Sequence, residues 1–234
     1  MKMYPFIAIE GMDGVGKNTT TQYLKSHISG LMASNQFKDP TISKVVTMSY
    51  PDYSTETGKK IKTELSLRKP HICELITLFA DNRAEQSNEI FEKLNGGSVV
   101  ICDRWTMSML VYAAQQMNIT TADKIIYSYE TLLNAVPIPS LYIVLTAPAN
   151  VCRQRLLERY KGDQTQLDAH EKDLELQEKV RSIYTTLCNT EYSSDLKTLN
   201  KAHIVHIDAE DSLQNTLTKI TKVVNDWLKA NNFL

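Results

Sequence analysis

The sequence lacks a dominant charge, a disulfide pattern and an uninterrupted apolar span. It balances 26 Lys+Arg against 27 Asp+Glu, which excludes a strongly basic nucleic-acid-binding protein. The four cysteines form no C-x-x-C pair or Cys/His zinc spacing, so we expect the reduced thiols of a cytoplasmic protein. A long uncharged stretch, residues 131–152, contains three prolines, and we therefore expect no membrane span.

Glycine is also scarce. The 234 residues include 8 glycines, about 3%, against roughly 7% in an average domain. Three of them, Gly11, Gly14 and Gly16, lie close together near the N-terminus. Glycine permits backbone conformations that other residues rarely adopt, and here it is gathered in one place. We expect the functional site at this cluster.

Five short apolar runs alternate with longer segments of helical periodicity. Runs rich in β-branched residues and without polar alternation are typical of strands buried on both faces. The predicted strands are residues 6–9, 45–48, 99–102, 141–145 and 203–207, and the predicted helices are residues 17–28, 74–94, 106–116, 121–133, 149–160, 167–187 and 212–228. This alternation predicts an α/β fold with three layers, α/β/α, around a five-stranded parallel sheet, in a single domain over residues 1–234.

The first apolar run leads directly into GMDGVGKNTT, residues 11–20, which has the G-x-x-x-x-G-K pattern of a phosphate-binding loop, or P-loop. Successive backbone N–H groups of such a loop point into one concavity, and the helix that follows adds its positive N-terminus. Lys17 adds a point charge for the phosphates. The predicted nucleotide-binding residues of the loop are Gly11, Asp13, Gly14, Val15, Gly16, Lys17, Asn18 and Thr19.

Two positions concern a metal ion. The residue after the lysine is usually Ser or Thr, whose hydroxyl binds Mg²⁺, but here it is Asn18. The third apolar run ends in Asp103, where phosphate-loop proteins place an acid that holds Mg²⁺ or its water shell. We therefore predict Mg²⁺ near Asn18 and Asp103, with weak direct ligation by the protein.

Along the first half of the chain lie four segments, IEGMDGVGKNTT, YPDYSTETGKKIKTEL, LFADNRAEQ and DRWTMSMLVY. In this order they resemble the signature segments of thymidylate kinases. The resemblance implies transfer of the γ-phosphoryl group of ATP to deoxythymidine monophosphate (dTMP) with Mg²⁺, and a P-loop nucleoside-monophosphate-kinase fold with a helical lid. It also implies small-molecule nucleotides as partners and usually a homodimer, with no nucleic acid or membrane partner.

The resemblance assigns roles to individual residues. The implied catalytic residues are Lys17, Asp13, Arg104 and Asp103, and Arg104 binds phosphate between donor and acceptor. The implied acceptor-binding residues are Asp13, Tyr50, Pro51, Phe79, Arg83, Arg104, Ser108 and Tyr112. Among these, Phe79 resembles the aromatic that stacks on thymine and Arg83 the residue that reads the base edge. Tyr112 resembles a residue that hinders a ribose 2′-hydroxyl.

Three positions depart from the family pattern. Tyr53 stands where an arginine often grips the acceptor phosphate, and Ala113 where a glutamine often follows the pocket tyrosine. Trp105 replaces a more usual Tyr, His or Phe. These departures leave the kinase chemistry in place. They keep open the alternative of a related pyrimidine nucleoside monophosphate kinase with a broadened or dUMP-type acceptor preference.

The resemblance places a lid at about residues 153–173. Arg155 and Arg159 lie four residues apart, so they share one helix face, and they match lid arginines of the family. Because the phosphate loop carries no arginine, the resemblance implies that the lid supplies this charge. We assign Arg153 to the charged surface of the helix and give His170 a structural role.

Two other classes of protein share such a loop. A nucleotide-hydrolysing switch or motor would carry a guanine-reading N-K-x-D segment or oligomeric-ATPase motifs, and the sequence has neither. The second class is a degenerate kinase fold used only for binding, which Asn18 and Tyr53 suggest. Measurable phosphoryl transfer would exclude it.

Overall fold

The structure is a computed structural model that describes residues 4–67, 71–119, 136–167, 169–189 and 202–234. Within these ranges the strands are β1 (Phe6–Gly11), β2 (Lys44–Ser49), β3 (Ser98–Asp103), β4 (Leu141–Thr146) and β5 (His203–Asp208). They form one parallel sheet in the order β2-β3-β1-β4-β5. The predicted five-stranded parallel sheet is confirmed, and each strand contains the apolar run that predicts it.

The central strands are buried because helices cover both faces of the sheet. Every residue of β1 and β4 is buried, and β3 is buried as far as Cys102. The edge strands β2 and β5 are partly exposed. β1 and β3 are paired in parallel, with Ile9 opposite Asp103. Because β1 ends at the phosphate loop and β3 ends at Asp103, this pairing brings two predicted site segments together at the carboxyl edge of the sheet.

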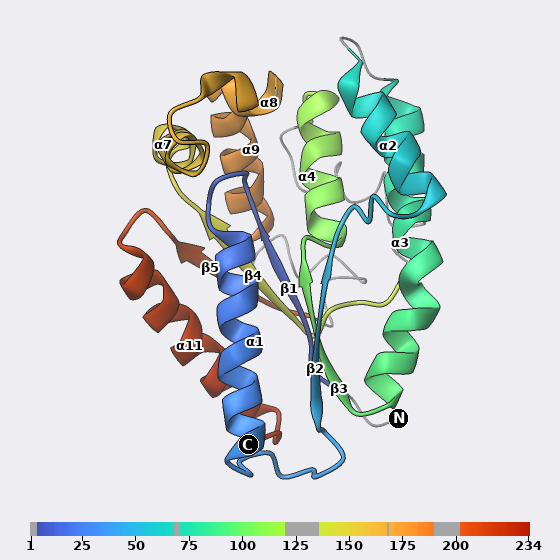
Figure 1. Cartoon of the computed structure of the whole chain (residues 1–234), viewed down its shortest axis with the longest axis vertical. Coiled ribbons are helices and arrows are strands. Elements are labelled where there is room, and N and C mark those ends of the chain that lie inside the picture. Colours follow the sequence, from blue (N-terminus) through green and yellow to red (C-terminus); the bar gives the residue numbers. More distant parts are fainter. Residues whose placement is uncertain (1–3, 68–70, 120–135, 168, 190–201) are drawn as a thin grey trace.

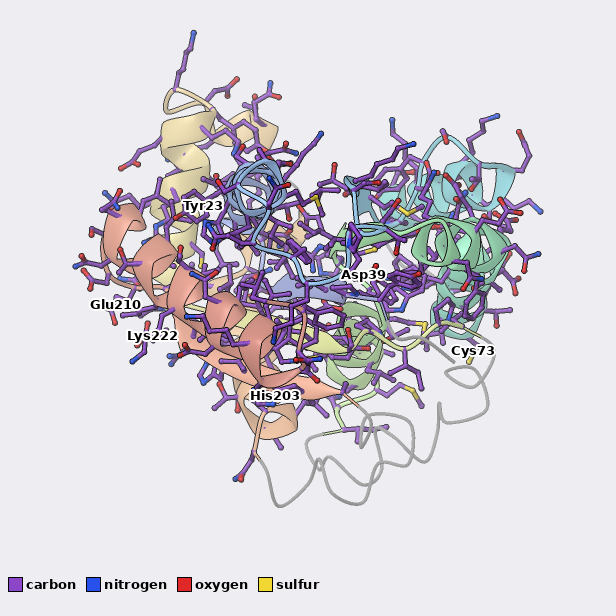
Figure 2. The ribbon with its side chains drawn as sticks, turned by 90° about the horizontal axis from the view of Figure 1, so that it is seen from below. Tyr23, Asp39, Cys73, His203, Glu210 and Lys222 are labelled. Carbon is purple, nitrogen blue, oxygen red and sulfur yellow. The ribbon has the colours of Figure 1, made fainter. Side chains whose placement is uncertain are left out.

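Among the described helices, two cover one face of the sheet and three cover the other. α1 (Lys17–Ala33) packs against β1, β2 and β3, and α11 (Leu213–Ala230) packs against β5. On the opposite face α3 (Ile72–Asn95), α4 (Thr106–Gln116) and α9 (Leu174–Leu187) pack against β3, β1 and β4 (Figure 1). Seen from below, α1 and α4 lie on opposite sides of the sheet (Figure 2). The three-layer arrangement is confirmed.

Shorter helices lie at the carboxyl end of the sheet, where the site is expected. α2 (Glu56–Ser66) packs beside α3. α7 (Ala149–Arg159) and α8 (Ala169–Lys172) lie next to α9, with the 3-10 turn Gln164–Gln166 between them in the chain (Figure 1). No helix in the described part of the chain is long and apolar enough to span a membrane. The four cysteines are free, as the sequence predicts.

Two helix predictions differ from the structure. The sequence pattern does not predict α2, although Thr55 caps this helix by accepting a hydrogen bond from the Gly58 N–H. The single helix expected over residues 167–187 is divided, because the Asp173 side chain accepts from the Leu176 N–H and starts α9. The helix predicted over residues 121–133 lies outside the described residues.

Candidate active site

The phosphate loop joins β1 to α1 in a conformation that requires glycine. Gly11 has a φ of +141° and Gly14 a φ of +77°, both in a region that other residues rarely adopt. A Cβ atom at Gly11 would overlap the Leu145 carbonyl, and one at Gly14 would overlap the Cys152 carbonyl. The loop therefore lies directly against the end of β4 and against α7. Its glycines provide close packing as well as backbone freedom.

Lys17 begins α1 and is almost completely buried. Its ammonium donates to the Met12 carbonyl at 2.6 Å and lies 3.7 Å from Asp13 Oδ1. Burial, with a smaller effect of Arg104, lowers the pKa of Lys17 to about 8, while Asp13 and Asp103 act in the opposite direction. The lysine is thus held inside the loop concavity, as the sequence predicts. Asn18 and Thr19 follow it with exposed side chains in the first turn of α1.

Asp13, Arg104 and Tyr112 form a hydrogen-bonded cluster beside the loop. The Arg104 guanidinium donates to Asp13 Oδ1 at 2.5 Å and to the Gly11 carbonyl at 3.0 Å. The Tyr112 hydroxyl donates to Asp13 Oδ2 at 2.9 Å. Burial raises the pKa of the Asp13 carboxyl, but Arg104, Lys17 and these donors together hold it well below its ordinary value. Asp13 is therefore a fixed carboxylate.

A cavity of about 220 Å³ opens next to this cluster, between α2, α3, α4 and α8. Seven of the predicted acceptor-binding residues line it: Asp13, Pro51, Phe79, Arg83, Arg104, Ser108 and Tyr112. Tyr50 does not. Its ring is buried in the core and packs edge-on against Trp105, with 4.6 Å between the ring centroids. The structure thus brings seven of these eight residues together at one cavity.

Arg83 forms a buried part of the cavity wall. It is 2% exposed, and its guanidinium donates twice to the Trp105 carbonyl, at 3.0 and 2.8 Å, and once to the Phe79 carbonyl at 2.8 Å. Burial lowers the pKa of Arg83 to about 10. These bonds fix the plane of the guanidinium beside the Phe79 ring, at 5.8 Å from its centroid. They use three of its five N–H groups and leave two for a ligand.

Asn82, which precedes Arg83, connects α3 to the residues around the start of α2. Its amide oxygen accepts from the Asp52 N–H at 2.8 Å, and its amide nitrogen donates to the Asp52 carbonyl at 3.1 Å. The same nitrogen donates to Thr55 Oγ1 and Thr57 Oγ1. These contacts join α3 to the segment between β2 and α2, which carries Pro51 to the cavity.

Asp103 and Asn18 offer oxygen atoms that could bind a metal ion close to the phosphate loop. Asp103 ends β3 with a half-buried side chain, and its charge acts on Lys17. Asn18 lies one residue beyond that lysine, with an exposed amide. Carboxylate and amide oxygens are ligands that Mg²⁺ accepts together with waters and phosphates. The Asp103 carboxylate and the Asn18 amide are therefore suitable ligands for the predicted Mg²⁺.

Two parts of the segment that was expected to form a lid make contacts elsewhere in the molecule. Arg155 of α7 donates to the Glu210 and Asp211 carbonyls, at 3.2 and 3.1 Å, in the loop between β5 and α11. Arg159 is exposed in the last turn of α7, and neither arginine lines the cavity. α8 instead brings His170 and Glu171 to the cavity wall. His170, to which the sequence analysis gives a structural role, thus lies at this cavity.

Glu10 is a second residue that sequence reasoning misses. It is fully buried at the end of β1, and its carboxylate accepts hydrogen bonds from the backbone N–H groups that open α4. The available signal is one acid in an otherwise apolar run directly before the phosphate loop. Burying a charge is costly unless it is hydrogen-bonded, so an acid in a predicted buried strand indicates a specific partner.

Lys17 is buried where β1, the glycine-rich loop and α1 meet. Asp103 and Arg104, at the end of the neighbouring strand β3, lie next to this loop and to a cavity large enough for a ligand. This fold and site define a P-loop phosphotransferase that binds nucleotides. The model of the family described as thymidylate kinase matches residues 9–220. The chain belongs to the thymidylate kinase family, and its function is that of a thymidylate kinase.

Individual relatives agree with this membership. A thymidylate kinase of Caldicellulosiruptor saccharolyticus is 29% identical over 227 residues, covering 96% of this chain and 97% of the relative. One of Dictyostelium discoideum is 32% identical over 76% of this chain and 71% of its own length. The solved thymidylate kinase of Candida albicans superposes with a TM-score of 0.65 at 22% identity, covering 98% of this chain and 92% of that one. This last likeness concerns the fold.

Proposed function

We propose that this chain transfers the γ-phosphoryl group of ATP to dTMP, giving the diphosphate and ADP. The observation that carries the proposal is the placement of Arg104. Its guanidinium contacts Gly11 and Asp13 of the phosphate loop and also lines the acceptor cavity. A cation in this position can contact the phosphates of both substrates while one phosphoryl group moves between them.

The chemistry needs positioning and charge stabilisation, because an oxygen of the acceptor phosphate attacks the γ-phosphorus directly. The loop N–H groups and Lys17 hold the donor phosphates, and a phosphate oxygen replaces the Met12 carbonyl as the partner of Lys17. Mg²⁺, when bound, neutralises charge on the donor phosphates, and Asn18 and Asp103 hold it directly or through its waters. Closure of the lid, with Arg155 and Arg159, excludes water from the reacting groups.

The cavity fits the acceptor by its shape and polarity. Phe79 offers a flat apolar face for the pyrimidine base, and the free N–H groups of Arg83 lie at the base edge. The sugar then lies beside the Asp13 carboxylate. The Tyr112 ring, held by its bond to Asp13, disfavours a 2′-hydroxyl and so favours deoxynucleotides.

One observation favours a broader acceptor range. Tyr53 lines the cavity where an arginine could grip the acceptor phosphate, and it is 46% exposed. Ala113 offers no side-chain amide at its own position on the cavity wall. dUMP differs from dTMP only by a methyl group, and an apolar pocket discriminates one methyl by roughly 10–200-fold at most. The second candidate is therefore a pyrimidine monophosphate kinase that also accepts dUMP.

ADP release with ATP and Mg²⁺ across dTMP, dUMP, dCMP, UMP and CMP tests both candidates. We expect the highest kcat/KM with dTMP. In the matched control Lys17→Ala, loss of a charge-assisted contact of about 1.5–3 kcal/mol lowers turnover efficiency at least roughly tenfold. Comparable rates with dUMP would favour the second candidate. ATP hydrolysis without any acceptor preference, or unchanged kinetics in Lys17→Ala, would contradict the proposal.

We further propose that the chain folds as one domain over residues 1–234 with a lid at about 153–173, and that it works as a cytoplasmic homodimer. Its partners are then small nucleotides, without nucleic acid or membrane. Light scattering of the purified chain should give twice the mass of one chain. Thermal unfolding should follow a single transition.

A further inference from the structure

The buried carboxylate of Glu10 is connected to the start of α4 by four hydrogen bonds. Oε1 accepts from the backbone N–H groups of Trp105 at 2.8 Å and Met107 at 3.1 Å. Oε2 accepts from the Ser108 N–H at 3.1 Å and also from the Ser108 hydroxyl. The first turn of a helix leaves such N–H groups without intrahelical partners. A side chain of β1 thus caps a helix that follows β3.

These four donors determine the ionisation of Glu10. A carboxylate offers about four lone-pair positions, and all four face donors; three of them are backbone N–H groups that cannot accept a proton. The pKa of Glu10 is raised above its ordinary value, because burial outweighs the lowering by its bonds to Ser108 and Trp105 and by the charges of Arg104 and Arg83. The positive end of the α4 dipole also favours the anion. Three of its four partners are backbone N–H groups, which can only donate, and on this geometry we assign the ionised carboxylate to Glu10.

The ionised form fixes the direction of the next hydrogen bonds. Ser108 has one hydroxyl hydrogen, and it donates this hydrogen to Glu10, so its oxygen can only accept from other groups. It accepts from Arg104 Nη1 at 3.1 Å and from the Tyr184 hydroxyl at 2.9 Å. The Arg104 guanidinium is thus held by Ser108 on one side and by Asp13 on the other. The Glu10 carboxylate in β1 is thus connected to the cavity through the Ser108 hydroxyl.

The backbone conformation of Arg104 explains why these hydrogen bonds are needed. Arg104 has a φ of +65°, a conformation that is strained for a residue with a Cβ atom and persists only where its surroundings enforce it. Its N–H donates to the Ile9 carbonyl at 2.9 Å, and the next N–H, of Trp105, donates to Glu10. Two consecutive residues of β1 therefore hold the turn that presents the Arg104 side chain.

We propose that Glu10 is a positioning residue for phosphoryl transfer: its carboxylate holds the first turn of α4 and the Ser108 hydroxyl, and thereby orients Arg104 between the phosphate loop and the acceptor cavity. This inference rests on the proposed function, because it assigns Arg104 a contact with both substrates. Glu10 itself touches neither substrate. Its effect belongs to the acceptor half of the site, since its carboxylate bonds to α4 and makes no bond to residues 11–17 among the described contacts.

The test compares the purified full chain with Glu10→Gln. Glutamine keeps the size of the side chain but turns an N–H donor toward the N–H groups of α4, and it no longer compels Ser108 to donate. We expect kcat/KM for the acceptor to fall roughly tenfold or more, through a higher acceptor KM and a lower kcat. The KM for ATP should change less than the acceptor KM, since the loop N–H groups and Lys17, which hold the donor phosphates, make no hydrogen bond to Glu10 among the described contacts. A uniform loss of active protein would lower kcat alone.

Two controls separate positioning from folding. Val224→Ala removes buried volume in α11, away from the cavity, and should lower the melting temperature without changing either KM. A cycle with Ser108→Ala should show coupling: because Glu10 acts in part through the Ser108 hydroxyl, the effect of Glu10→Gln should be smaller in the Ser108→Ala background than in the wild type. Kinetic constants of Glu10→Gln that match the wild type after correction for folded fraction, or fully additive effects in the cycle, would overturn the proposal.

Failure of the proposed function would be recognised separately. The wild-type acceptor panel tests that function, whereas the role of Glu10 is tested by the ratio of variant to wild type with whichever monophosphate the enzyme phosphorylates.

Discussion

The lowered pKa of Lys17 predicts how ATP use depends on pH. Lysine ordinarily titrates at about 10.4, but burial lowers the pKa of this ammonium to about 8. In the free enzyme about nine-tenths of Lys17 is then protonated at pH 7 and about one-tenth at pH 9. Only the protonated form offers a charge to the β- and γ-phosphates. We expect kcat/KM for ATP to fall about tenfold per pH unit above pH 8, because this parameter reports the ionisation of the enzyme form that binds ATP.

The assay is a pH profile of ADP release between pH 6.5 and 9.5 at saturating acceptor. Lys17→Arg is the matched variant, because a guanidinium stays protonated throughout this range. It should be slower overall, since its planar fork does not reproduce the ammonium, but its profile should lack the alkaline fall. A flat wild-type profile would refute the reasoning. The same alkaline fall in Lys17→Arg would assign the titration to another group.

The same shift has a consequence for stability. A lysine whose pKa is lower in the folded state binds fewer protons there than in the unfolded state between about pH 8 and 10.5, so its contribution makes stability rise with pH over that window. Cys152 and Cys188 act oppositely above about pH 9, because burial raises their pKa values to about 11 and about 12. Denaturant unfolding of wild type and Lys17→Met isolates the lysine, and the advantage of the variant should shrink as pH rises.

Three further substitutions test the geometry of the site. Gly14→Ala places a Cβ atom against the Cys152 carbonyl at a φ of +77°, so the affinity for ATP, measured by calorimetry, should fall by at least roughly tenfold. An unchanged affinity would contradict the close packing of the loop against α7. Tyr53→Arg adds a cation to the cavity wall and should lower the acceptor KM several-fold while the KM for ATP is unchanged. Asn82→Ala leaves the Asp52 N–H without its partner, so the free energy of unfolding in urea should fall by about 1–3 kcal/mol and the acceptor KM should rise. A loss of stability below the measurement error would contradict the supporting role of Asn82.

Local patterns predicted much of the fold. The five strands follow from apolar runs rich in β-branched residues, because a strand buried on both faces leaves no room for polar alternation. The predicted bounds of α4, residues 106–116, match the structure. α2 escaped prediction because Gly58 interrupts a short and weakly apolar segment. That glycine is required by a close contact with the segment just before the helix, since a Cβ atom there would overlap the Asp52 carbonyl.

The site divides in the same way. The phosphate loop could be read from the sequence, because its glycines, its lysine and its flanking strand and helix are neighbours in the chain. The acceptor side needed family resemblance to join Phe79 and Arg83 to the loop, since their spacing alone favours a core aromatic and a surface arginine. The structure brings both to one cavity with Asp13, and it buries Tyr50 against Trp105 in the core.

The sequence by itself determined that this chain forms a parallel α/β sheet with a phosphate loop at the end of its first strand. Both properties arise from residues close together in the chain, through backbone conformation and the burial of apolar runs. Only the tertiary structure decided how Arg104 is aimed. The groups that hold it, Glu10, Asp13 and Ser108, come from segments nearly a hundred residues apart, and a hydrogen bond across that separation leaves no local pattern to read.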